Sequence, residues 1–178
     1  MLYTRTGDDG TSGLLGECRM PKDSLVFDAL GALDELNSLL GVCVVKARGR
    51  DDGKDLSIAP ALRLAQEHLF IIQAQLAGAK KEITSEYIAG VEHTIADIET
   101  RIKNPHAFVI AGATELSAFL DLARTVARRT ERSVIAARAE RELPAPAMQY
   151  LNRLSSLLYA VARLAAQDSG EPEPSPRY

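Results

Sequence analysis

Apolar residues recur every three or four positions through five long stretches of the chain, and this spacing constrains its fold more than any other feature. It is the spacing of one face of an α-helix, and glycine, proline or clustered polar residues separate the stretches. Five amphipathic helices joined by mostly short connections bury their apolar faces most simply in an antiparallel bundle. Helices are therefore expected over about 24–48, from near Pro60 to Gly78, over about 88–102, over about 115–140, and from near Pro146 to about 168.

The predicted fold class is thus all-α, a five-helix bundle with a ferritin-like up-down arrangement behind a glycine-rich N-terminal loop. A chain of 178 residues with 46% hydrophobic residues is long enough to bury one sizeable core, so a single domain is expected over 1–168. The polar run 49–55 and Asn104-Pro105 are read as breaks between helices. Residues 169–178 hold three prolines and are predicted to be a disordered tail.

Charge and cysteine content limit the partners of the protein. With 21 basic and 24 acidic residues the net charge is −3, which argues against nucleic-acid binding as the main role. Cys18 and Cys43 form neither a metal-ligand spacing nor a disulfide framework, and Cys43 is expected to be a core residue. No apolar signal region or membrane-length apolar run is present in the sequence. A cytoplasmic protein without a membrane partner is therefore expected.

The N-terminal loop has the composition of a phosphate-binding segment. Its glycines allow backbone N–H groups to turn inward, and threonine and serine hydroxyls lie among flanking cations. The segment is not a Walker loop, because Thr11 follows Gly10 where a Gly-Lys-Ser/Thr ending would be needed. Taken alone, such a segment is more often a plain surface loop. The glycines are Gly7, Gly10, Gly13 and Gly16.

Three arginines on the predicted fourth helix form a second cationic feature. Arg124, Arg128 and Arg132 recur every four residues and so share one helix face. Like charges at this spacing destabilise a helix by about 0.2–0.5 kcal/mol per pair. Asp121 and Glu131 can offset part of that repulsion, which would make the face a salt-bridged, solvated one. An anionic ligand would offset the rest, because guanidinium groups bind phosphate oxygens in pairs.

Two further stripes do not follow the core pattern. On the first helix a carboxylate stands among small residues, which would let another backbone, a side chain or a flat ligand approach, although helix packing alone would explain the glycines. On the last helix a polar stripe is read as a solvated face. Phe108, taken alone, is read as a core phenylalanine at an element boundary. The stripes are Gly31, Asp34, Ser38 and Gly41, and Asn152, Ser156, Tyr159 and Arg163.

A set of short motifs occurs in the order and approximate spacing of the PduO-type ATP:cob(I)alamin adenosyltransferases, and the chain resembles this family from about residue 2 to 166. The resemblance implies a five-helix bundle assembled as a homotrimer, with ATP between neighbouring subunits and cobalamin beside it. The implied reaction transfers the 5′-deoxyadenosyl group of ATP to reduced cobalamin and releases triphosphate. The motifs are Thr4-Arg5-Thr6-Gly7-Asp8, Lys22-Asp23, Asp34-Glu35-Leu36-Asn37-Ser38, Glu115-Leu116-Ser117-Ala118, Ala123-Arg124-Thr125-Val126, Arg128-Arg129-x-Glu131-Arg132 and Tyr150-Leu151-Asn152-Arg153-Leu154-Ser155.

The resemblance also implies roles for individual residues. Residues 1–23 would be the nucleotide-binding loop, and Mg²⁺ would accompany the phosphates with Glu131 as a candidate contact. Asp34, Arg124 and Phe108 would border the cobalamin, Asp34 and Arg124 as a salt bridge across the subunit interface. Phe108 would occupy the lower axial face of the corrin and keep the cobalt four-coordinate; these three and Arg128 form the catalytic set. The ATP-binding residues would be Thr4, Arg5, Thr6, Gly7, Ser12, Gly13, Lys22, Arg128, Arg129, Glu131, Arg132 and Asn152.

The implied chemistry agrees with the residues present. Reduced cobalt is itself the nucleophile, so no serine, cysteine or histidine activated by a base is needed. A flavoprotein-type reductase and a cobalamin-dependent enzyme are the further partners it implies. Some positions depart from the family pattern, namely Asp9, Ala111, Ala113 and Ser156. These departures leave two other functions open. The protein could be a carrier or regulatory bundle that binds ATP or a corrinoid without efficient transfer, or a structural oligomer whose arginines bind an acidic partner.

Overall fold

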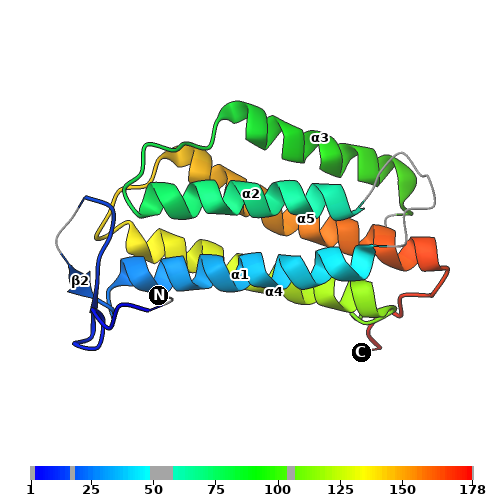
Figure 1. Ribbon diagram of the computed structural model, residues 1–178. Coiled ribbons are helices and arrows are strands. Elements are labelled where there is room, and N and C mark those ends of the chain that lie inside the picture. The colour runs from blue at the N-terminus through cyan, green and yellow to red at the C-terminus, as the bar shows by residue number, and fades with distance from the viewer. Residues whose placement is uncertain (1–2, 17–18, 49–57, 104–106, 178) are drawn as a thin grey trace.

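The computed structural model of the protein describes residues 3–16, 19–48, 58–103 and 107–177, and its helices follow the predicted pattern (Figure 1). The described residues thus confirm the all-α bundle, and none of their helices is long and apolar enough to cross a membrane. The predicted breaks at 49–55 and Asn104-Pro105, and Cys18, lie outside the described residues. The helices are α1 (Leu25–Ala47), α2 (Ile58–Leu76), α3 (Ser85–Arg101), α4 (Glu115–Ala137) and α5 (Ala145–Ser169).

Helices α1, α4 and α5 make up the main packing of the bundle. Helix α1 packs against α4 and α2, while α5 packs against α4 and α3, so that α3 lies along one side of the bundle (Figure 1). Leucines such as Leu36, Leu120 and Leu158 are fully buried between them, and each such side chain contributes about 1.5–3 kcal/mol by leaving water. Cys43 is also a core residue, as predicted, and burial raises the pKa of its thiol to about 11.

Local hydrogen bonds fix the helix ends that carry the site. Thr114 and Ser117 form a capping box at the start of α4. After the end of α4, both carboxylate oxygens of Glu140 accept backbone N–H groups of Leu25 and Val26, at 3.1 and 3.2 Å. Those N–H groups begin α1 and have no partner within the helix. Glu140 therefore holds the end of α4 beside the start of α1.

The N-terminal segment contains a short hairpin that the sequence did not predict. Strands β1 (Thr11–Ser12) and β2 (Met20–Pro21) pair in antiparallel fashion, with Thr11 opposite Pro21. Strands of two residues are too short to leave an alternating apolar pattern, so no such pattern marks them. The backbone N–H of Leu15 donates to the carbonyl oxygen of Ala77 at 3.0 Å, so the segment is attached just beyond the end of α2.

The C-terminal segment 170–177 differs from the disordered tail that its prolines predicted. Helix α5 ends at Gly170, which adopts the left-handed conformation (φ 75°) that glycine favours after a helix. The chain then runs back along the bundle, and the backbone N–H of Ile110 donates to the carbonyl oxygen of Pro174 at 2.8 Å. Glu173 meets the buried Arg163. The prolines keep this segment out of a helix, and the ion pair holds it on the bundle.

Candidate functional site

The arginine row lies on α4 as the spacing predicted. The guanidinium of Arg124 is partly buried, and its Nε lies 3.3 Å from Oδ1 of Asp121. Arg132 donates from Nη1 to the backbone carbonyl of Arg128 at 3.0 Å. Among the residues that the structure describes, the exposed Arg128 guanidinium has no ion-pair partner. The row therefore keeps positive charge available for an anion, and Asp121 offsets only part of it.

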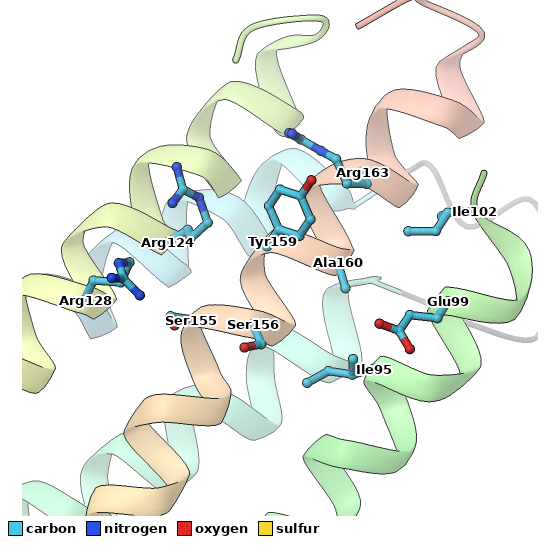
Figure 2. Close-up of a pocket in the computed structure, with 10 residues that line it drawn as sticks. All are labelled: Ile95, Glu99, Ile102, Arg124, Arg128, Ser155, Ser156, Tyr159, Ala160 and Arg163. Atoms are coloured by element: carbon cyan, nitrogen blue, oxygen red, sulfur yellow. The ribbon is translucent and has the colours of Figure 1, made fainter. Parts of the chain in front are cut away.

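Two of these arginines line a groove of about 380 Å³ between α3, α4 and α5. Figure 2 shows Arg124 and Arg128 on α4 beside Ser156 and Tyr159 on α5, with Glu99 on α3 across the groove. The α4 wall is thus cationic, the α5 wall carries hydroxyl groups, and the α3 wall carries the Glu99 carboxylate beside apolar side chains. Ser156, one of the departures from the family pattern, contributes a small hydroxyl here. The remaining lining residues are Ile95, Ile102, Ser155, Ala160 and Arg163.

Residues beside the arginine row on α4 form hydrogen bonds with side chains on other helices. Arg129 donates from Nη2 to Oε2 of Glu35 on α1 at 2.5 Å. Glu131 accepts a hydrogen bond at 3.1 Å from Nδ2 of Asn152 on α5. The structure therefore joins two members of the predicted ATP set, Glu131 and Asn152. In the described part of the chain, no group of three or more histidine, cysteine, aspartate or glutamate residues could hold a metal ion.

The N-terminal loop is held together by its own cations. The guanidinium of Arg19 donates from Nε to the Thr11 hydroxyl at 2.7 Å and from Nη2 to the backbone carbonyls of Thr11, at 2.7 Å, and Thr6. Lys22 donates from Nζ to the carbonyl of Gly7 at 2.8 Å. A Cβ on Gly7 would lie 2.9 Å from that Nζ and 3.2 Å from the carbonyl oxygen of Thr11, so a side chain here would push the Lys22 ammonium away from the loop. Arg19 organises the loop, although only its charge marked it in the sequence.

Within this loop the backbone of Arg5 is strained. Its φ of 60° is the only left-handed value at a described non-glycine residue. Thr4 and Thr6, on either side, share a hydrogen bond between their hydroxyl oxygens at 2.8 Å. Strain of this kind persists only where the surroundings hold it, and it concentrates at functional sites. The three residues are exposed, whereas Ser12 lies in β1 and Gly13 follows it.

Asp9, one of the departures from the family pattern, uses its carboxylate inside the loop. Its Oδ1 accepts the hydroxyl of Thr11 at 2.7 Å and the backbone N–H of Thr11 at 2.9 Å. The hydroxyl bond, followed by the backbone bond, lowers the pKa of the Asp9 carboxyl. Arg19 lies 3.8 Å away. The negative charge of Asp9 is therefore turned toward its own loop.

Asp34 and Phe108 are not among the residues that line the groove beside the arginine row. The exposed Asp34 lines a second groove, of about 550 Å³, between α1 and α2 together with Gly31 and Phe70. Within the described chain it forms no ion pair with Arg124. Phe108 is 78% exposed on the segment between α3 and α4, so the reading as a core phenylalanine is wrong. It lies outside the helices, where no neighbouring element covers it.

The structure also reveals a charge cluster that the sequence analysis missed. Arg163, read as part of a solvated face, is only 3% exposed and pairs with both Asp121 and Glu173. The expectation of a solvated side chain is wrong because the C-terminal segment covers it. The spacing of polar residues on α5 cannot reveal that Arg163 is covered, because the residues that cover it lie in the segment after the helix.

The hydrogen bonds and ion pairs among the described residues do not join the loop to the arginine row. The loop is attached to the end of α2 through Leu15, while Arg124 and Arg128 face the groove between α3, α4 and α5. Asp34 belongs to a third place, between α1 and α2. Within a single chain the loop, Asp34 and the arginine row therefore lie in three separate places.

Comparison with known proteins gives the family. The family model described as cobalamin adenosyltransferase matches residues 2–165. The corrinoid adenosyltransferase PduO of Salmonella typhimurium is 37% identical over 175 residues, which cover 94% of this chain and 50% of the relative. The corrinoid adenosyltransferase of Bacillus subtilis is 34% identical over 173 residues, covering 95% of this chain and 88% of that protein. The chain thus spans half the length of the Salmonella relative.

Solved structures of a PduO-type ATP:corrinoid adenosyltransferase from Lactobacillus reuteri have the same fold. A phenylalanine-to-alanine variant complexed with cobalamin and ATP aligns at a TM-score of 0.90 with 25% identity, covering 100% of both chains. An arginine-to-lysine variant complexed with ATP aligns at 0.88 with 25% identity, covering 99% of this chain and 100% of the other. By the family match over nearly its whole length, this chain belongs to the cobalamin adenosyltransferase family.

Proposed function

We infer that this chain is an ATP:cob(I)alamin adenosyltransferase. It transfers the 5′-deoxyadenosyl group of ATP to the cobalt of reduced cobalamin and releases triphosphate. The observation that carries this inference is the family match over residues 2–165. In that range the arginine row lies on α4, where the exposed Arg128 lines a groove and has no counter-ion among the described residues. The names of the curated relatives and of the solved neighbours describe the same activity.

The reaction requires stabilisation of the negative charge on the departing triphosphate more than it requires acid–base chemistry. A bond forms between cobalt and the ribose C5′ while the bond from C5′ to the triphosphate oxygen breaks, and the bonding electrons leave with the triphosphate. Fixed cations aimed at that oxygen stabilise the developing charge, and a positioned ribose lowers the entropic cost. We propose that Arg128, Arg132 and Lys22 supply this charge.

The remaining nucleotide contacts are proposed from the motif positions. Thr4, Arg5, Thr6 and Gly7 would bind the phosphates, and the strained Arg5 backbone supports a functional role for that turn. The rest of the phosphate site would be formed by Ser12, Gly13 and Arg129. Asn152 would hold Glu131 in position through the hydrogen bond between them. Mg²⁺ would accompany the phosphates, with Glu131 as its candidate protein ligand.

We propose that the complete site forms between the subunits of a homotrimer. Asp34 and Arg124 line different grooves of one chain, and Asp34 is exposed, so a neighbouring subunit can bring the two together. Their salt bridge would then shape the cobalamin site at the interface. The loop, which lies apart from the arginine row within one chain, would reach the row of the adjacent subunit in the same way.

Phe108 is proposed to bind the lower axial face of the corrin. Its exposed ring leaves it free to pack against a flat ligand. A ring in that position excludes a lower ligand from cobalt, and axial ligation sets the potential of a macrocycle-bound metal, so reduction to the nucleophilic state becomes easier. A reductase partner, a cobalamin-dependent acceptor enzyme and a cytoplasmic location remain predictions from the sequence.

Incubation of the protein with ATP, Mg²⁺ and chemically reduced cobalamin tests the function. An enzyme produces the absorption spectrum of an alkylated corrinoid and releases triphosphate in equal amount. A carrier would shift the spectrum of the bound corrinoid without consuming ATP, and a structural oligomer would do neither. Either of these two outcomes would overturn the proposed function.

A further inference from the structure

The C-terminal segment 170–177 packs against the segment that carries Phe108. The backbone N–H of Ile110 donates to the carbonyl oxygen of Pro174 at 2.8 Å. Val109, between Phe108 and Ile110, lines a cavity of about 220 Å³ together with Glu173 and Arg163. The position of residues 107–110 therefore depends on where the C-terminal segment lies.

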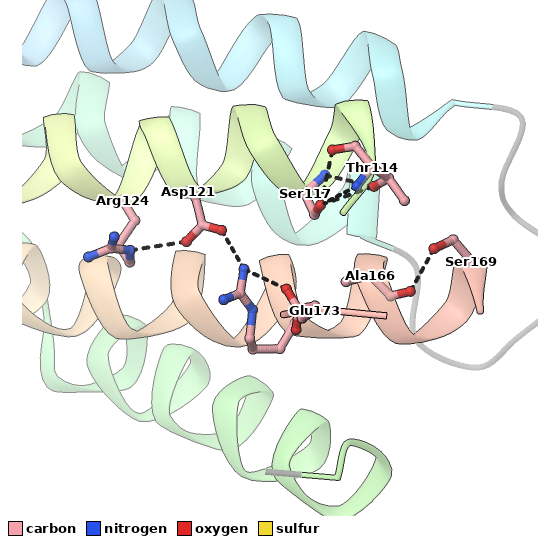
Figure 3. A network of polar contacts seen from close by, with 8 residues as sticks. Thr114, Ser117, Asp121, Arg124, Ala166, Ser169 and Glu173 are labelled. Atoms are coloured by element: carbon pink, nitrogen blue, oxygen red, sulfur yellow. Dashed lines mark hydrogen bonds and ion pairs between the residues drawn. The ribbon is translucent and has the colours of Figure 1, made fainter. Parts of the chain in front are cut away.

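A buried charge cluster holds the C-terminal segment in place. Glu173 lies 3.0 Å from the guanidinium of Arg163, whose side chain is 3% exposed. On the opposite side Arg163 pairs with Asp121, and Asp121 also accepts a hydrogen bond from Arg124 at 3.3 Å. Figure 3 shows Asp121 between Arg124 and the end of α5, where Glu173 comes in from the C-terminal segment. Two carboxylates thus face two guanidiniums, and their charges sum to zero.

This balance needs Glu173. A buried guanidinium is costly unless it is paired, and removing one partner from a buried pair leaves an uncompensated charge. Without Glu173, Asp121 would be the single carboxylate in the cluster for both Arg163 and Arg124. Asp121 already accepts Arg124 at Oδ1 and Arg163 at Oδ2, so a shift of the unbalanced Arg163 would move this shared carboxylate and change the orientation of Arg124 together with the position of the C-terminal segment.

The docking of the segment is finely balanced. Burial raises the pKa of the Glu173 carboxyl, the attraction of Arg163 lowers it, and Asp121 raises it further. Nε of Arg163 is buried without a hydrogen-bond partner among the described residues. The ion pair therefore holds the segment at a cost in desolvation.

We propose that Glu173 is a positioning residue for adenosyl transfer: by pairing with Arg163 it docks residues 170–177 on residues 107–110 and thereby sets both Phe108 and Arg124. This rests on the proposed function, because the two residues it positions belong to the proposed site. Glu173 itself would touch neither substrate. Its effect passes along two short connections, from Pro174 to Ile110 and from Arg163 through Asp121 to Arg124.

Hydrogen exchange of the Ile110 amide in the substrate-free protein tests the docking directly. Glu173→Gln keeps the size of the side chain and removes its charge, and we expect the Ile110 amide to exchange at least about tenfold faster as the segment opens. Glu171→Gln is the matched control, because it removes the same charge two residues away from an exposed side chain. Unchanged exchange in Glu173→Gln would overturn the proposal.

The effect on the site is read from bound cob(II)alamin. In Glu173→Gln with ATP present, the spectroscopic signature of the four-coordinate form should weaken, and kcat with reductase-supplied corrinoid should fall roughly tenfold, while the KM for ATP changes little. Glu173→Asp should restore part of both. A normal signature and normal kcat despite faster Ile110 exchange would overturn the positioning role. If the wild-type protein forms no alkylated corrinoid, the proposed function fails instead, and the exchange comparison still decides whether Glu173 docks the segment.

Discussion

At the scale of single residues, the clearest feature is that the charge of Arg128 is left without a partner inside the chain. Arg124 has Asp121 and Arg129 has Glu35, but the exposed Arg128 guanidinium forms no ion pair with a described residue. Its removal therefore leaves no acidic partner behind in the fold. A residue of this kind can be lost with little effect on folding and a large effect on binding of an anion.

We expect Arg128→Ala to lower kcat/KM for ATP by roughly 10- to 100-fold, because a charge-assisted hydrogen bond contributes about 1.5–3 kcal/mol. The free energy of unfolding should change by less than about 0.5 kcal/mol, as for other surface substitutions. Arg63→Ala is the control, since Arg63 is an exposed arginine on α2. Steady-state kinetics and denaturant unfolding measure both quantities; wild-type activity in Arg128→Ala would remove this residue from the site.

Phe108 gives the second residue-scale prediction. Because its ring is 78% exposed, Phe108→Ala should leave the free energy of unfolding nearly unchanged, which a core phenylalanine would not. Transfer to chemically reduced cobalamin should persist, while the rate with reductase-supplied cob(II)alamin should fall at least about tenfold, because the lower ligand is no longer excluded. Parallel assays with the two cobalt states separate these effects. Equal reductase-coupled rates in variant and wild type would contradict the role.

At the scale of elements, a buried histidine joins helices α2 and α5. Nδ1 of His68 lies 2.9 Å from the hydroxyl of Tyr150, and the ring of Tyr87 on α3 lies 4.4 Å from the His68 ring. Burial lowers the pKa of His68 below its ordinary value of 6.5, and Glu67 only partly opposes this. The packing of three helices therefore depends on a neutral imidazole.

This gives a prediction for stability against pH. Above about pH 6.5 both the folded and the unfolded chain hold His68 neutral, and the folded packing contributes fully. As pH falls below that value the unfolded chain takes up a proton that the folded chain resists, so the free energy of unfolding should decrease until the lowered native pKa is passed. His68→Asn should flatten this dependence in denaturant titrations between pH 7.5 and about 5. His93→Asn, at an exposed histidine, should leave it in place.

A second element-scale prediction concerns the start of α1. Glu140 accepts the N–H groups of both Leu25 and Val26, so Glu140→Ala leaves two helix-end donors without their partner. The expected loss is roughly 0.5–2 kcal/mol, the range for helix N-caps. Glu142→Ala removes a carboxylate that makes no ion pair with a described residue and should cost far less. Equal unfolding midpoints for the two variants would show that the Glu140 link contributes nothing.

At the scale of the whole molecule, the bundle could be predicted from the sequence because five helices with apolar faces can bury those faces against one another in few arrangements. Prediction from the sequence failed where a structure depends on contacts outside the three-to-four-residue spacing of a helix. The two-residue strands need a partner eight or more residues away, and the burial of Arg163 needs Glu173 to fold back. The motifs nominated the residues of the candidate site, but the separation of the loop, Asp34 and the arginine row is a property of the folded chain alone.

That separation supports sites shared between protomers and gives the last prediction. Lys22→Ala would disable the loop half of a shared site, and Arg128→Ala would disable the row half. In a mixed trimer, one of the three interfaces combines an intact loop with an intact row. Random mixing makes about three quarters of trimers mixed, so about a quarter of the wild-type activity should return when the two inactive variants are unfolded and refolded together. Sites contained in one chain would give no recovery, and sedimentation of the same samples would show whether trimers had formed.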